Sequence, residues 1–136
     1  GVVAVKEATG DLRYGTQLLL ATDTPVLSGD DFSFLGLLAQ GGTGCVSVVS
    51  NVLPEATVAI YEAFVSGDRL SATKRFTALF PLMSWLMEVS NPIHAKAALA
   101  VLGHGGPTTR PPLAGLSESL PTEKVRALVE AVEAAS

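Results

Sequence analysis

The sequence predicts an α/β fold in which three βα units form a parallel sheet and a helical region follows. Three short runs rich in apolar, β-branched residues each precede a segment of helical character. Such alternation is typical of βαβ units with right-handed crossovers. The chain is also 48% hydrophobic and only 16% charged, which suits strands that are buried on both faces.

In the first half of the chain, apolar runs predict the strands, capping residues predict the helix starts and glycines predict the helix ends. The expected strands are Val2–Lys6, Pro25–Gly29 and Cys45–Ser50, and the expected helices are Leu12–Ala21, Phe32–Gln40 and Pro54–Ser66. Helix starts are marked by Asp11, by Asp30 or Asp31, and by Asn51, because such side chains accept hydrogen bonds from the free amides of a first turn. Glycines mark the helix ends at residues 41, 42 and 67.

The second half shows helical signals and no further strand. Residues 68–89 carry an apolar stripe at helical spacing, formed by Phe76, Leu79, Phe80, Met83, Leu86 and Met87. Pro81 should kink this helix, because its ring removes one backbone hydrogen bond. Two more helices are expected at Pro92–Leu102 and Thr122–Ala135, with a loop at 103–121. We therefore expect two parts, the βα units in residues 1–67 and a helical region in residues 68–136.

Composition and patterning exclude several classes of protein. The net charge is −4 and the nine basic residues are scattered, so no basic patch for nucleic acid is expected. The uncharged stretch from residue 32 to 54 is interrupted by glycines and polar residues, which argues against a membrane span. No charged segment followed by an apolar run indicates a signal peptide. Together these features favour a cytoplasmic protein.

The cysteine and the two histidines do not indicate a catalytic thiol or a metal site. Cys45 is the single cysteine, so a disulfide within the chain is impossible, and its apolar surroundings favour an inert thiol over a nucleophile. His94 and His104 have no cysteine or clustered carboxylate at ligand spacing. We expect no metal site and no cofactor.

Three parallel strands alone leave two sheet edges open. A closed (β/α)8 barrel needs about 250 residues, and this chain has 136 and begins with Gly1 rather than Met. We expect residues upstream of Gly1 that supply the first half of a barrel.

Lys6 is the candidate for catalysis. Side chains alternate along a strand, so if Val3 and Val5 face the helices, Lys6 points into the barrel at the carboxyl end of its strand, where barrel enzymes hold their chemistry. Burial there would lower the pKa of the amine, and a neutral amine attacks a carbonyl to form a Schiff base. The alternative is a terminal lysine that reaches solvent or pairs with Glu7.

Five segments in register resemble one family along essentially the whole chain. They are "GVVAVKEATGD", "LSGDD", "GGTGCVSVVSNVLPEA", "NPIHAKAAL" and "RPPLAGLSE". They are similar to the carboxyl-terminal half of the dihydrodipicolinate synthases, which belong to the pyruvate-dependent class I aldolases. The resemblance implies the last three βα units of a (β/α)8 TIM barrel, followed by an extra carboxyl-terminal helical region.

The resemblance also implies roles for individual residues. Lys6 matches the lysine that forms an imine with pyruvate, and the derived enamine then attacks aspartate semialdehyde. Val46 falls where the family uses a main-chain carbonyl beside pyruvate, and Gly29 falls beside the substrate pocket, where glycine permits close approach. Asp30 and Asp31 follow the family pattern, but their reading as loop and capping residues stays open.

Some features depart from the family or are absent. His94 stands where proline is usual, and "VSN" at 49–51 replaces the commoner "TAN". The family's tyrosine proton donor and its lysine feedback site precede the imine lysine, and we read Tyr14 and Tyr61 as packing or surface residues. Three functions stay open: a synthase, often a homotetramer, that acts in lysine and diaminopimelate biosynthesis; an inactive half-barrel; and a sister aldolase acting on a 2-keto-3-deoxy sugar acid.

Overall fold

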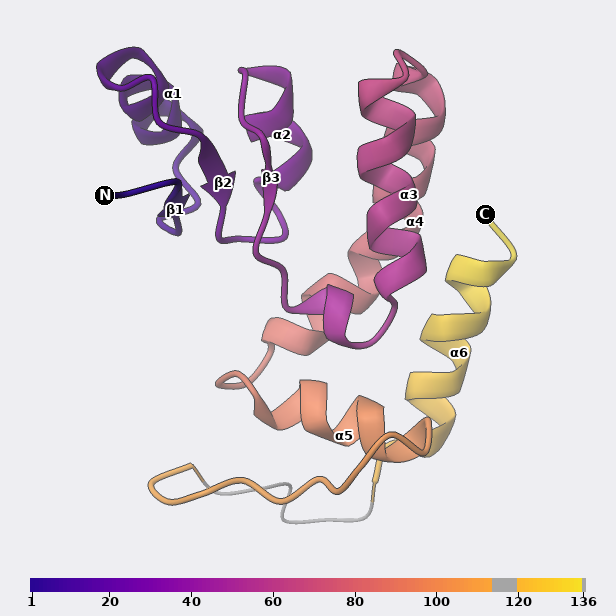
Figure 1. Ribbon diagram of the computed structural model, residues 1–136. Coiled ribbons are helices and arrows are strands. Elements are labelled where there is room, and N and C mark those ends of the chain that lie inside the picture. Colours follow the sequence, from indigo (N-terminus) through magenta and orange to yellow (C-terminus); the bar gives the residue numbers. More distant parts are fainter. Residues whose placement is uncertain (114–119, 136) are drawn as a thin grey trace.

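The computed structural model describes residues 1–113 and 120–135, and the predicted loop at 103–121 lies partly outside these ranges. A three-stranded parallel sheet in the order β1-β2-β3 stands beside a group of packed helices (Figure 1). The elements are, in order, β1 Val5–Glu7, α1 Leu12–Ala21, β2 Val26–Ser28, α2 Phe34–Ala39, β3 Gly44–Cys45, a 3₁₀ turn η1 at Val49–Asn51, α3 Pro54–Val65, α4 Arg69–Met87, α5 Ile93–Val101 and α6 Thr122–Glu133. The predicted alternation of strand and helix, followed by helices, is confirmed.

The strands are shorter than the sequence predicts. Val2 and Val3 lie before β1 and are 78% and 85% exposed, because none of the described residues pairs with or covers them. The third predicted strand ends at Cys45, and its last residues form η1 instead. The prediction of a strand through Ser50 is therefore wrong.

The apolar core lies mainly between the helices. It joins α2 and η1 to α3, α4, α5 and α6, and its fully buried members include Ile60, Leu79, Leu82 and Val125. Helix α4 continues across Pro81 as one element, and it packs along α3 (Figure 1). The division at residue 67 stays a prediction, since this core includes residues from both sides of it.

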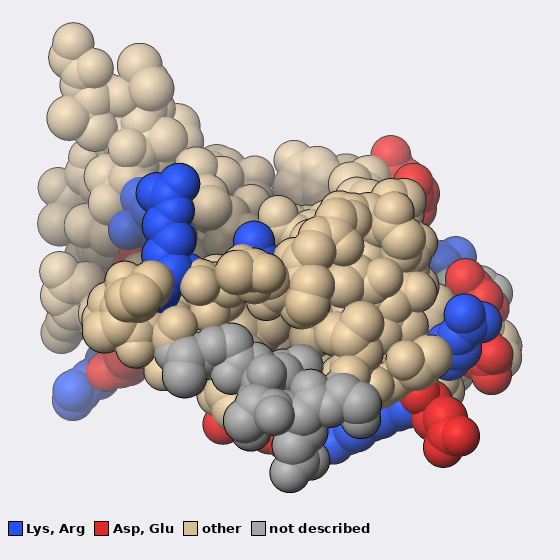
Figure 2. Space-filling model, turned by 90° about the horizontal axis from the view of Figure 1, so that it is seen from below, with Lys and Arg blue, Asp and Glu red and all other residues tan. Residues whose placement is uncertain are grey.

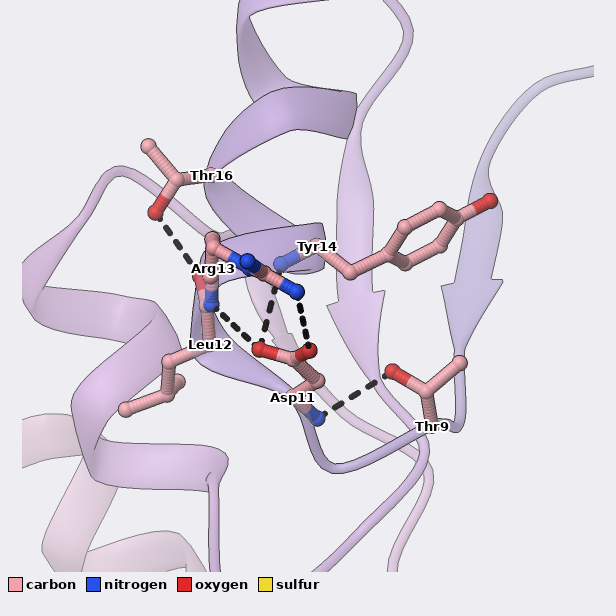
Figure 3. A network of polar contacts seen from close by, with 6 residues as sticks. All are labelled: Thr9, Asp11, Leu12, Arg13, Tyr14 and Thr16. Atoms are coloured by element: carbon pink, nitrogen blue, oxygen red, sulfur yellow. Dashed lines mark hydrogen bonds and ion pairs between the residues drawn. The ribbon is translucent and has the colours of Figure 1, made fainter.

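Asp11 begins α1 as expected. Its Oδ1 accepts hydrogen bonds from the amides of Arg13 at 2.8 Å and Tyr14 at 3.4 Å (Figure 3). Its own amide donates to Oγ1 of Thr9 at 3.1 Å, so the loop after β1 and the helix start form one polar network. The exposed pair of Asp11 and Arg13, at 3.9 Å, adds little because water screens it. This network holds the backbone of the loop that connects β1, the strand of Lys6, to α1.

His94 has a structural role. Its ring stacks on that of Trp85, with centroids 4.2 Å apart and planes 10° apart. Nδ1 lies 2.6 Å from the Trp85 carbonyl oxygen, and because a carbonyl only accepts, Nδ1 carries the proton. The histidine thus joins α5 to the end of α4.

Charged residues of both signs are interspersed on the face seen in Figure 2. No helix within residues 1–113 and 120–135 combines the length and the apolar character that a bilayer crossing requires.

Candidate active site

The register of the sheet decides which way Lys6 points. Lys6 is paired with Leu27 of β2, and Leu27 with Gly44 of β3, so these residues share one face. Val5 and Glu7 lie on the opposite face together with the fully buried Val26 and Ser28. The predicted alternation is confirmed, and Lys6 lies on the face away from α1 and α2.

Glu7 does not pair with Lys6. Its side chain is only 4% exposed and lies on the helix side of the sheet, where Oε1 accepts the amide proton of Thr9 at 2.6 Å. Pairing between Lys6 and Glu7 is thereby excluded. The buried glutamate was not anticipated, because a polar residue next to a strand end is ordinarily expected in solvent.

Lys6 is exposed in this structure. Burial of the amine was expected within a completed barrel and stays a prediction, since the described residues do not close this face. The reason is geometric: α1 and α2 cover the other face of the sheet, and none of the described elements covers the face of Lys6 (Figure 1).

Gly29 lies directly against the Lys6 side chain. Its amide donates to the Glu7 carbonyl and so extends the pairing of β1 with β2. A Cβ added at Gly29 would lie 2.5 Å from Cε of Lys6 and 2.7 Å from Cβ of Ala8. The close approach that glycine permits here is therefore to the lysine itself.

We expect Gly29→Ala to lower the free energy of unfolding by about 1 to 3 kcal/mol, the usual cost of overpacking. The flexible Lys6 side chain can move away from the added methyl group. The Cβ of Ala8 is bonded directly to the backbone and cannot move without it. Urea denaturation followed by circular dichroism measures the change. The control is Gly106→Ala, where an added Cβ meets nothing within 4 Å; equal stability of the two variants would contradict the expected crowding.

Val46 follows β3 on the face of Lys6, two residues beyond Gly44. Its amide donates to the Ser28 carbonyl at 2.7 Å, which ties its backbone to β2. Within the described ranges its carbonyl accepts no hydrogen bond. Lys6, Gly29 and Val46 thus stand at the carboxyl ends of three adjacent strands, with a free acceptor at the last of them.

Ser28, Asp30 and Asp31 organise the loop after β2. Oδ2 of Asp30 accepts the amide of Ser33 at 2.8 Å, and Ser28 Oγ donates to the Asp30 carbonyl at 2.7 Å. Asp31 reaches further, because its Oδ2 accepts the amides of Val48 and Val49, both at 3.0 Å. The capping interpretation of the two aspartates is supported, although Asp31 caps η1 rather than its own helix.

Cys45 is electrostatically disfavoured as a nucleophile. Burial, then the carboxylates of Asp31 and Asp30, raise the pKa of its thiol from the ordinary 9.0 to about 12, against smaller opposing effects of Lys6 and Ser28. The thiol therefore stays protonated at neutral pH. The residue is half-buried rather than fully buried, and the predicted inertness follows from its pKa.

A groove of about 290 Å³ lies between the edge of β3 and α3, and Lys6 is not among the residues that line it. Its walls include Thr43, Gly44, Cys45 and, from α3, Thr57 and Tyr61. Tyr61 therefore stands at the open edge of the sheet and away from the lysine. No cluster of three or more potential metal ligands occurs in the part of the chain that the structure describes.

Comparisons with known proteins agree with this geometry. Residues 1–132 match the model of the Dihydrodipicolinate synthetase family. A 4-hydroxy-tetrahydrodipicolinate synthase of Archaeoglobus fulgidus is 38% identical over 134 residues, which are 97% of this chain and 46% of that protein. The chain therefore spans less than half the length of this relative.

Solved structures show the same partial coverage. The 4-hydroxy-tetrahydrodipicolinate synthase of Methylacidiphilum fumariolicum SolV superposes with a TM-score of 0.87 at 33% identity, over 98% of this chain and 45% of that chain. The chloride-inhibited dihydrodipicolinate synthase of Acinetobacter baumannii, solved as a complex with pyruvate, gives a TM-score of 0.86 at 30% identity, over 97% of this chain and 46% of that chain.

The fold is that of the carboxyl-terminal part of a (β/α)8 barrel enzyme chain, with three parallel βα units and added helices. The lysine at a strand end on the open face fits the class of barrel proteins whose chemistry lies at the carboxyl ends of the strands. The chain belongs to the dihydrodipicolinate synthetase family.

Proposed function

We propose that this chain is the carboxyl-terminal part of a 4-hydroxy-tetrahydrodipicolinate synthase, a lyase of lysine and diaminopimelate biosynthesis. The observation that carries the proposal is the placement of Lys6, Gly29 and Val46 together at the carboxyl ends of β1, β2 and β3. Its substrates are pyruvate and aspartate semialdehyde. The pyruvate complex of the Acinetobacter baumannii relative supports the choice of keto acid.

In the proposed reaction the neutral amine of Lys6 attacks the carbonyl carbon of pyruvate, and water leaves to give an iminium ion. The iminium withdraws electrons, so the methyl group loses a proton and an enamine forms. The enamine carbon then bonds to the aldehyde carbon of aspartate semialdehyde, whose oxygen takes up a proton. The carbonyl of Val46 is free to accept a hydrogen bond from the bound substrate.

The amine becomes an effective nucleophile when a complementary amino-terminal half of the barrel covers it. Several described features suit that partner: the exposed Lys6 face, the unpaired Val2 and Val3, and the groove beside β3. The completed chain is proposed to form a homo-oligomer, and the proton donor comes from the complementary half.

Trapping with borohydride tests the proposal. The 136-residue chain is incubated with pyruvate, reduced and weighed, alone and as a chimera in which it replaces the matching part of the Archaeoglobus fulgidus relative. One reduced pyruvate per chain is expected on Lys6, faster in the chimera. It is expected to disappear in Lys6→Ala and to persist in Lys74→Ala, which removes an exposed lysine of α4.

Two outcomes overturn the proposal. Absence of an adduct from both the chain and a folded chimera leaves only a structural role for these residues. If, without borohydride, the chimera condenses pyruvate with the aldehyde precursors of 2-keto-3-deoxy sugar acids and not with aspartate semialdehyde, the chain belongs to a sister aldolase.

A further inference from the structure

Asp31 is the most deeply buried carboxylate among the described residues, at 2% exposure. Both bonds to its Oδ2 come from backbone amides of a segment 17 and 18 residues further along the chain. Its Oδ1 is buried without a hydrogen-bond partner. A half-satisfied buried carboxylate is costly, so its presence calls for a reason beyond stability.

The two amides belong to Val48 and Val49, at the start of η1. They follow Val46 by two and three residues, and the amide of Val46 is held by the Ser28 carbonyl of β2. The backbone from Val46 to Val49 is therefore tied to the β2 side at both of its ends. Between these ties lies the Val46 carbonyl, which has no partner in the described chain.

We propose that Asp31 is a positioning residue for the Schiff-base reaction, acting through the backbone of Val46. Its carboxylate turns the chain into η1 immediately after β3 and so holds the Val46 carbonyl at the end of β3, on the sheet face that carries Lys6. This inference rests on the proposed function, because it concerns the carbonyl beside bound pyruvate. Without the carboxylate, the segment after Cys45 loses the bonds that end the strand there.

Asp30 provides a matched comparison within the same loop. Its carboxylate accepts only the amide of Ser33, three residues away, and it makes no bond to the segment after β3. Replacing Asp30 therefore removes a local cap and leaves the tie between the two loops intact. Asp31→Asn keeps an oxygen that can accept both amides while removing the charge.

Two reactions of the Lys6 amine separate positioning from general damage. Pyruvate trapping with borohydride requires the Val46 carbonyl in place, whereas reductive methylation with formaldehyde requires only an accessible amine. Each rate is measured at Lys6 by mass spectrometry for the folded 136-residue chain and the chimera. The ratio of the two rates is compared only among variants whose circular dichroism spectrum matches that of the wild type, since an unfolded chain still exposes its amine to formaldehyde.

We expect the ratio to fall at least tenfold in Asp31→Ala and in Asp31→Ser, and to stay within threefold of the wild type in Asp31→Asn and Asp30→Ala. Asp31→Ser fills more of the vacated space and serves if Asp31→Ala does not fold. A ratio unchanged in the alanine or serine variant overturns the inference while the proposed function stands. A wild type that pyruvate does not modify overturns the proposed function, and the inference with it.

Discussion

Leu82→Ala is expected to lower the free energy of unfolding by about 3 kcal/mol. Leu82 is 0% exposed and lies in the helical core on α4, the helix that packs along α3. The substitution removes its apolar contacts and leaves a cavity that the surrounding helices fill only in part. This loss is a large fraction of the stability of an ordinary domain.

Urea denaturation of the 136-residue chain, followed by circular dichroism, measures the effect. The control is Leu70→Ala on the same helix, where the leucine is 82% exposed, and we expect a change below about 0.5 kcal/mol. If the two variants lose similar stability, Leu82 does not belong to the apolar core described above.

The thiol of Cys45 is expected to react with iodoacetamide at pH 8 at least tenfold more slowly in the folded chain than in urea. With a pKa of about 12 instead of 9.0, its thiolate is about a thousandfold scarcer. The greater intrinsic reactivity of a more basic thiolate offsets part of this difference. Asp31→Asn removes the second largest cause of the shift, so this variant should react faster than the wild type.

The same thiol is expected to weaken the fold at alkaline pH. In the unfolded chain it loses its proton near pH 9.0, whereas in the folded chain it keeps the proton to about pH 12. Ionisation then favours the unfolded state, and the free energy of unfolding falls by up to about 1.4 kcal/mol per pH unit within that window. Below pH 9 both states are protonated and the effect vanishes.

Cys45→Ser isolates this contribution, because serine does not titrate in the range. Urea denaturation of both proteins between pH 8 and 10.5 should give curves that diverge only above pH 9, with the wild type losing more stability. Parallel curves would show that the folded thiol ionises at its ordinary pKa.

Local patterns in the sequence were sufficient for the order of elements. Period-two alternation placed Lys6 and Val5 on opposite faces, and the register confirms it. Asp11 was identified as a helix cap from its position, and its bonds to Arg13 and Tyr14 involve neighbours in sequence. Such features depend on interactions between residues that are close in sequence, so a local sequence pattern is enough to predict them.

Other features depend on distant residues and could not be predicted in this way. The strand expected to reach Ser50 stops at Cys45, and the Asp31 carboxylate lies on the amides that follow. A hydrogen bond between residues 17 positions apart cannot be predicted from a local sequence pattern. The crowding of Gly29 against Lys6 is likewise a contact between strands, and only the resemblance had drawn attention to that glycine.

The burial of Lys6 stays a prediction, because Lys6 is exposed among the described residues and the covering elements are not among them. A side chain that points away from α1 and α2 is covered only by further strands and helices on that side. The roles of Lys6, Gly29 and Val46 stay predictions, because their common placement is geometric and their chemistry awaits trapping.

The concentration of buried side chains among the helices has a consequence for motion. The buried apolar cluster joins α3 to α6 and includes no residue of β1. We therefore expect local opening of β1 to expose little apolar surface while these helices stay packed. In such a fold the helices α3 to α6 stay rigid, whereas the sheet is more mobile. The more mobile portion carries Lys6, and an element that packs on this face would restrain it.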